Sequence, residues 1–88
     1  MGRYAVQLRP SADRALARLP EDAQRRIVLA LADLGVEPRP AGVKKLAGDD
    51  NLWRIRVGAY RAVYEIHARP PLVMVLRVAH RKDAYREK

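Results

Sequence analysis

The sequence predicts an α+β fold of the order β-α-α-β-β-β, with a helical hairpin packed on a four-stranded, mostly antiparallel sheet. Residues 52–66 contain two runs in which apolar and polar residues alternate, and Gly58-Ala59 separates them as in an antiparallel hairpin. Two stretches with helical spacing of apolar residues precede this hairpin, and a nearly continuous apolar run follows it. The 88 residues suffice for one modest core, so we expect residues 1–88 to form a single domain.

The first part of the chain is expected to form one strand and two helices. Residues 3–9 alternate apolar and polar side chains, which predicts a strand with one buried face. The first helix is predicted to begin with Ser11 as its N-cap and to end before Pro20. The second helix is predicted to begin after Pro20, where two acidic residues suit the positive end of the helix dipole, and to end at Gly35. We expect the apolar sides of both helices to face the sheet.

A basic loop follows the helices. Residues 36–51 contain two prolines and two glycines and show no sustained period, which is typical of a connecting segment. Lys44 and Lys45 in this loop either lie in solvent or guide a polyanion. After the hairpin, the apolar run at residues 72–78 predicts a central strand covered on both faces. The remaining residues are expected to form a short C-terminal tail or helix.

The charge balance indicates an anionic partner. The chain has 18 Lys and Arg against 10 Asp and Glu, a formal net charge of +8, and this favours nucleic acid, a membrane surface or an acidic protein. No apolar run reaches the roughly 18–20 residues of a membrane span. The chain has no cysteine, and its histidines and carboxylates lack metal-ligand spacing, so we expect no metal and no cofactor. An intracellular, cytoplasmic protein is the default expectation.

Three arginines are expected to meet on one face of the hairpin. Arg54 and Arg56 share a face because strand residues alternate, and cross-strand pairing would bring Arg61 close to them. Guanidinium groups repel one another at such distances, so stability alone does not explain the cluster. Their fork-shaped donors match phosphate oxygens, which predicts phosphate binding. We expect Arg61 to lie outside the core, whereas Trp53 and Tyr64 are expected to lie in it.

Proton transfer has one strong candidate. Acid–base chemistry at a phosphate bound by these arginines would need a proton acceptor and a proton donor. His80 ends the last predicted strand, where its side chain either reaches the arginines or merely packs, and histidine changes its charge near neutral pH. Arg81 is a phosphate ligand or a surface charge. Tyr85 stacks on a base, donates from its hydroxyl or anchors the tail. Glu65 is expected to pair with neighbouring arginines.

The hairpin and the tail together resemble the RelE toxins of bacterial and archaeal toxin–antitoxin systems, within the RelE/ParE superfamily. The matching segments are LWRIRVG at residues 52–58, YRAVY at 60–64 and VLRVAHRKDAYR at 75–86. The resemblance implies an endoribonuclease that cuts messenger RNA in the ribosomal A site and inhibits translation. It also implies a cognate antitoxin that neutralises the toxin in a hetero-oligomeric complex, which binds its operator through the antitoxin.

The resemblance further implies roles for individual residues. Basic residues on the central strands of the family bind and orient the scissile phosphate, and they match Arg54, Arg56 and Arg61. A basic residue after the last strand matches Arg81, and a tyrosine in the tail matches Tyr85. Some members have lysine at the positions of Arg54 and Arg56. Arginine stays protonated, so a mechanism that needs a neutral amine at these positions does not suit this chain.

Two other functions stay open at this point. A ParE-like member of the superfamily would poison DNA gyrase by binding it and would cut no RNA. The arginine cluster, together with His80, Arg81 and Tyr85, argues against this function, because ParE-like chains generally lack the whole set. The sequence also allows a basic RNA-binding module, or a toxin whose catalysis has decayed.

Overall fold

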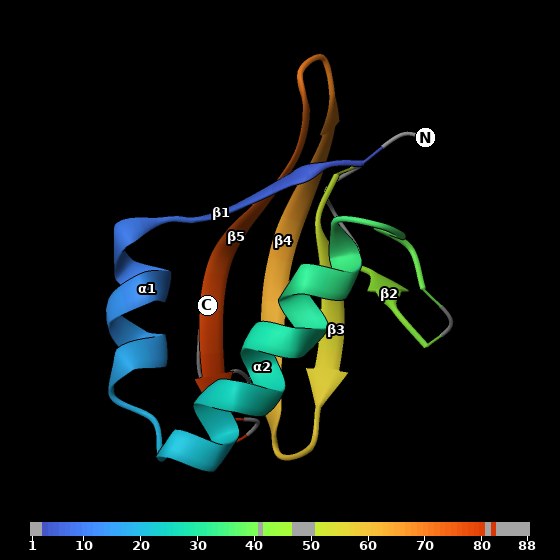
Figure 1. Cartoon of the computed structure of the whole chain (residues 1–88). Helices are drawn as coiled ribbons and strands as arrows, with labels where there is room; N and C mark the ends of the chain where they lie inside the picture. The colour runs from blue at the N-terminus through green and yellow to red at the C-terminus, as the bar shows by residue number, and fades with distance from the viewer. Residues whose placement is uncertain (1–2, 41, 47–50, 81, 83–88) are drawn as a thin grey trace.

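The computed structural model describes residues 3–40, 42–46, 51–80 and 82, and in these residues two helices lie on one face of a five-stranded sheet (Figure 1). The elements in chain order are β1 (Ala5–Leu8), α1 (Pro10–Ala17), α2 (Glu21–Leu34), β2 (Lys44–Lys45), β3 (Trp53–Val57), β4 (Tyr60–Ala68) and β5 (Pro71–His80). The predicted α+β class and helical hairpin are confirmed. Neither helix is long and apolar enough to cross a membrane.

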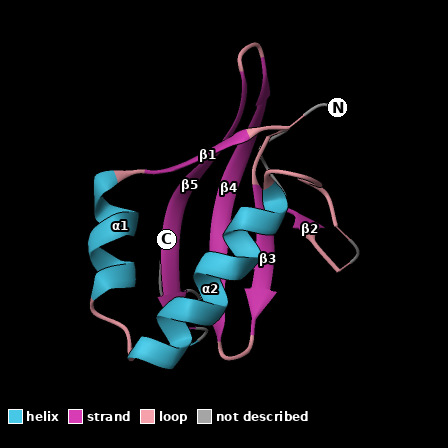
Figure 2. Ribbon diagram, viewed as in Figure 1, coloured by secondary structure: helices cyan, strands magenta, loops and turns pink. Residues whose placement is uncertain are grey.

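The sheet has the strand order β1-β5-β4-β3-β2, and only the β1–β5 pair is parallel (Figure 2). The prediction of a mostly antiparallel sheet is therefore confirmed, but the number of strands exceeds the predicted four. The additional strand is β2, in which Lys44 pairs with Arg54 and Lys45 with Trp53. Two residues are too few to show the alternation that identifies a strand in a sequence.

The helices begin and end close to the predicted positions. Helix α1 starts at Pro10 with Arg9 as its N-cap, so the prediction of Ser11 as N-cap is wrong. Proline suits the first helical position because its φ is already fixed and its missing N–H has no partner there. Helix α2 ends at Gly35 as predicted. The Tyr4 amide donates to the Gly35 carbonyl over 2.7 Å, and a Cβ on Gly35 would lie 2.9 Å from the Tyr4 carbonyl oxygen.

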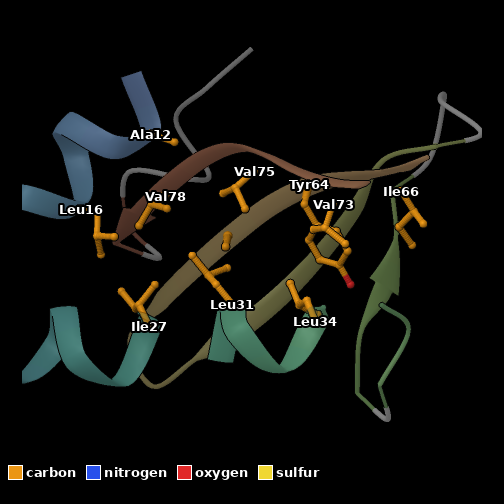
Figure 3. Packing of buried hydrophobic residues seen from close by; sticks show 11 residues of the cluster. Ala12, Leu16, Ile27, Leu31, Leu34, Tyr64, Ile66, Val73, Val75 and Val78 are labelled. Atoms are coloured by element: carbon orange, nitrogen blue, oxygen red, sulfur yellow. The ribbon is translucent and has the colours of Figure 1, made fainter. Parts of the chain in front are cut away.

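The core lies between the helices and the sheet. Ile27, Leu31 and Leu34 recur along one side of α2 and are almost fully buried (Figure 3). They belong to a cluster with Ala12, Leu16, Ala62, Tyr64, Ile66, Val73, Val75 and Val78. Each large apolar side chain buried in this way stabilises the fold by roughly 1.5–3 kcal/mol. The expected core position of Tyr64 is confirmed.

No described helix covers the other face of the sheet (Figure 1). On β5, Val73 and Val75 are completely buried, whereas Leu72 and Met74, which alternate with them, are only partly buried. The prediction that this strand is covered on both faces is therefore wrong for the described residues. Continuous hydrophobicity signals a buried strand without saying what covers each side.

Candidate functional site

The strand register places the three predicted arginines on the uncovered face of the sheet. Arg56 pairs directly with Arg61 across β3 and β4, and Arg54 lies two residues before Arg56 on the same strand. Directly opposed residues of an antiparallel pair point to the same side, and alternate residues of one strand share that side. Ile55, between the two arginines of β3, packs against the core on the opposite side.

These arginines line a cavity of about 250 Å³ together with Gly42 and Lys44, and we call it the cationic cavity. Among the described residues, no salt bridge involves Lys44, Arg54 or Arg56. Several positive charges therefore converge on one concave surface, where they would attract an anion with several oxygen atoms.

Burial differs sharply between the paired arginines. Arg56 is exposed, but Arg61 is only 8% exposed. The expectation that Arg61 lies outside the core is thus wrong as to burial, although its side chain lines the cationic cavity. The reason is its position on β4, which has β3 on one side and β5 on the other. A cation so placed is held more firmly than one on an open surface.

The two loop lysines lie on opposite sides of the sheet. Lys44 pairs with Arg54 and lines the cationic cavity. Lys45 pairs with Trp53, and its Nζ lies 5.8 Å from the centre of the Trp53 ring, a cation–π geometry. The structure therefore separates Lys45 from the cationic cavity, so of the two lysines that the sequence offered as guides for a polyanion only Lys44 lies there. Strand alternation is the physical reason.

His80 lies on the side of the sheet opposite the arginines. It pairs with Tyr60, whose side chain alternates with that of Arg61, and the rings of His80 and Tyr60 meet edge to face with centroids 5.3 Å apart. The Nδ1 of His80 accepts a hydrogen bond from the Lys82 amide over 3.2 Å. The expectation that the side chain reaches the arginines is therefore wrong, because the register of β4 and β5 turns it toward the helix side.

A further arginine on this face was not among the predicted site residues. Arg77 on β5 pairs with Val63, so it lies on the same face as Arg61, one alternation step along β4. Its only signal in the sequence is a single charge within an otherwise apolar run. Arg81 and Tyr85 lie outside the described residues.

Acidic and metal-binding groups contribute little to this face. The Glu65 carboxylate contacts His67 Nε2 at 3.0 Å, so the predicted pairing of Glu65 with an arginine is wrong. Residues two apart on a strand point the same way, which brings these two side chains together. In the described part of the chain, no group of three histidines or carboxylates could hold a metal ion.

The loop that follows α2 is fastened to the sheet next to the cationic cavity. The hydroxyl of buried Tyr64 donates to the Pro38 carbonyl oxygen over 2.7 Å. Burial raises the pKa of Tyr64 to about 12, and the nearby Arg39 cation partly opposes this. Arg39 also lies over the Trp53 ring at 5.2 Å. These contacts fix the loop segment that leads to Gly42 and Lys44.

Comparisons with known sequences agree on one group of proteins. Residues 6–85 match the family described as the ParE toxin of the type II toxin-antitoxin system, parDE. The toxin RelG of Mycobacterium tuberculosis is 37% identical over 87 residues, which cover 94% of this chain and 97% of that protein.

Solved structures give the same result. The chain of the archaeal RelE-RelB complex from Pyrococcus horikoshii matches with a TM-score of 0.79 and 30% identity, over 92% of this chain and 97% of that one. A chain of the RelBE2 toxin-antitoxin complex from Mycobacterium tuberculosis matches with a TM-score of 0.79 and 33% identity, over 91% and 93% of the two chains. The protein therefore belongs to the RelE family of type II toxin–antitoxin toxins, within the RelE/ParE superfamily.

Proposed function

We propose that this toxin is an endoribonuclease that cuts messenger RNA in the ribosomal A site and thereby inhibits translation. The observation that carries the proposal is the cationic cavity, in which Lys44, Arg54, Arg56 and Arg61 converge on about 250 Å³. Guanidinium groups bind phosphate oxygens with two parallel hydrogen bonds. We propose that one RNA phosphate occupies this cavity, so that the bond to be cut lies beside these guanidinium donors.

In the proposed reaction the ribose 2′-oxygen attacks the phosphorus, and the bond from phosphorus to the 5′-oxygen breaks. The 2′-OH proton would pass to water and the leaving 5′-oxygen would take up one proton, so the products are a 2′,3′-cyclic phosphate and a free 5′-hydroxyl. Arg56 and Arg61 would stabilise the negative charge that develops on the phosphate oxygens, and one well-placed donor of this kind is worth about 10²–10³ in rate. The guanidinium groups would supply the positive charge that a metal ion provides in other nucleases.

The tail would complete the site. Arg81 matches the family's basic residue after the last strand and would bind the phosphate, because arginine stays protonated. Tyr85 matches the family's tail tyrosine, and its hydroxyl would donate the proton that the leaving 5′-oxygen takes up. His80 would hold the start of the tail in place, because its Nδ1 accepts a hydrogen bond from the Lys82 amide. The described site thus has several phosphate-binding groups and few proton-transfer groups. The cleavage rate at such a site would increase most if another macromolecule held the substrate in place, and the ribosome would do this.

A cognate antitoxin is the proposed protein partner. The related chains from Pyrococcus horikoshii and Mycobacterium tuberculosis were solved as toxin–antitoxin complexes. Here, an apolar cavity of about 200 Å³ lies between α1, α2 and β1, and Val28 and Leu29 beside it are 50% and 63% exposed. An amphipathic helix of the antitoxin would bury these side chains, and an acidic segment of it would reach the cationic cavity.

The proposal is tested by primer extension on a defined messenger RNA, with and without programmed 70S ribosomes. We expect cuts within the A-site codon only when ribosomes are present, and we expect the cognate antitoxin to abolish them. Cuts on naked RNA would support the ribonuclease activity but would contradict its dependence on ribosomes. An intact message in both reactions, with folded protein, would refute the ribonuclease.

The family match to the ParE toxins makes gyrase poisoning the second candidate. A gyrase poison needs a surface that binds the enzyme, but it has no use for a cavity lined by several arginines. Inhibition of supercoiling by purified DNA gyrase separates the two functions. We expect no inhibition at toxin concentrations that cut messenger RNA on ribosomes.

A further inference from the structure

A second cavity adjoins the cationic one. It has a volume of about 580 Å³ and lies between α2, the loop before β2 and the end of β3. Gly42 and Arg56 line both cavities, so the two are neighbours along one continuous surface. A ligand that places an anionic group among the arginines could therefore extend past Arg56 into this second space, which we call the side cavity.

The sheet and its turns keep the side cavity open. Strand β2 pairs only with Trp53 and Arg54, so no described strand covers the outer edge of β3 beyond them. Gly42 and Gly58 line the cavity, and their φ angles of 90° and 60° favour glycine. At Gly58 the Arg26 guanidinium occupies the neighbouring space, because a Cβ there would lie 3.1 Å from it. A Cβ on Gly42 would meet no atom within 4 Å, which shows the free space directly.

The lining suits a flat aromatic ring with hydrogen-bond donors on one edge. Ala30, Pro40 and Ile55 contribute apolar surface, and Asp33 on α2 contributes the carboxylate. In the described part of the chain, Asp33 takes part in no salt bridge, although Arg56 lines the same cavity. A carboxylate accepts two parallel hydrogen bonds. It therefore suits a ligand with two adjacent N–H donors.

Guanine meets this requirement. Its Watson–Crick edge carries N1–H beside the N2 amino group, whereas adenine, cytosine and uracil each place an acceptor next to their donor on that edge. We propose that the side cavity binds a guanine base adjacent to the phosphate in the cationic cavity, with Asp33 as the acceptor for N1–H and N2–H. The location of the phosphate rests on the proposed function. The preference for guanine can be measured separately.

The direct test uses short 2′-O-methyl RNAs, which lack the nucleophilic hydroxyl and so cannot be cut. One set varies the base on the 3′ side of a central phosphate and a second set varies the base on its 5′ side. Fluorescence anisotropy gives the affinity for each RNA. In one set we expect guanine to bind about tenfold more tightly than the other bases, which is typical of one bidentate contact. In the Asp33→Asn variant, the four affinities should agree within twofold.

The matched control is Asp22→Asn. Asp22 is an exposed residue on the same helix that does not line the side cavity, and the substitution changes the net charge equally. This variant should retain the full preference for guanine. Asp33 lies in the last turn of α2, where a negative charge opposes the helix dipole, so Asp33→Asn should fold as stably as the unaltered protein.

The outcomes separate this inference from the proposed function. Equal binding of all four bases, or a preference that survives Asp33→Asn, would overturn the guanine site even if ribosome-bound messages were cut. A preference for guanine that depends on Asp33, in a protein that leaves messages on ribosomes intact, would support the site and refute the nuclease. With both activities present, cut sites should be enriched in neighbouring guanine, and Asp33→Asn should remove that enrichment.

Discussion

The two faces of strands β3 and β4 differ in almost every physical property, although they are built from alternate residues. On the helix side, Tyr64 is completely buried in the apolar core, and the partly buried Ile55 packs against that core. On the other side, Arg56 and Arg61 line a cavity with two more cations. A shift of one residue in register would exchange these faces. The packing of the core therefore also determines where the charges lie.

Arg61 shows how the two faces cooperate. It is almost as buried as the core residues around it, yet it lines the cationic cavity. Flanking strands on both sides restrict its side chain, whereas Arg56 at the edge of the sheet stays exposed. The uncovered face thus has a buried interior cation and an exposed outer one. Substitutions on each face should separate stability from activity.

The largest effect is expected from the core. Ile27→Ala removes a side chain that is 1% exposed and leaves a cavity against the sheet, so the free energy of unfolding should fall by about 2–5 kcal/mol. Urea titration followed by circular dichroism measures this. The neighbouring Val28→Ala, at a site that is 50% exposed, should cost no more than about 0.5 kcal/mol. Equal losses in the two variants would contradict the assigned orientation of α2.

The next largest effect is expected on the cationic face. Arg56→Ala should slow cleavage on programmed ribosomes about 10²-fold, because it removes a donor to the scissile phosphate while leaving an exposed site that folds normally. Arg69→Ala removes an exposed arginine in the turn before β5 and changes the net charge equally. If both variants lost activity equally, the overall charge and not the cavity would drive catalysis.

The sequence predicted the arginine cluster and the core better than it predicted the edges of the site. Alternation placed Arg54 and Arg56 on one face, and the short turn of the predicted hairpin brought Arg61 to them, since both signals are local. The position of His80 depended on the pairing of β4 with β5, which includes a register shift after Val63 that local pattern does not contain. The side of the sheet on which Lys45 lies depended on β2, a strand of two residues that shows no alternation in the sequence. Long-range register, and not composition, limited the prediction.

An intermediate effect is expected for the contact that fastens the loop to the sheet. Tyr64→Phe removes the hydroxyl that donates to Pro38, leaves a buried carbonyl without that donor, and should lower the free energy of unfolding by about 1–3 kcal/mol at neutral pH. Burial raises the pKa of Tyr64 from 10.0 to about 12, so the unfolded chain loses this proton first as the pH rises. The stabilising contribution is therefore complete below pH 10 and is lost between pH 10 and about 12.

Urea titrations of both proteins from pH 8 to 11.5 test the pH dependence. The difference in stability between the unaltered protein and Tyr64→Phe should be constant at the lower pH values and should shrink above pH 10. Other tyrosines and lysines titrate in both proteins, so their contributions cancel in the difference. A difference that stays constant to pH 11.5 would show that the phenol titrates normally in the folded state.

The smallest effect is expected from the paired lysines, and it tests the division between the faces most closely. Lys44→Ala removes one phosphate ligand, so a plot of the logarithm of affinity for 2′-O-methyl RNA against the logarithm of salt concentration should become less steep by about 0.7. Lys45→Ala should leave that slope unchanged, because its ammonium group lies over the Trp53 ring on the other side of the sheet. It should instead cost about 0.5–1 kcal/mol of stability. Equal changes of slope would mean that RNA contacts both sides of β2, and the two faces would then not be functionally distinct at this edge.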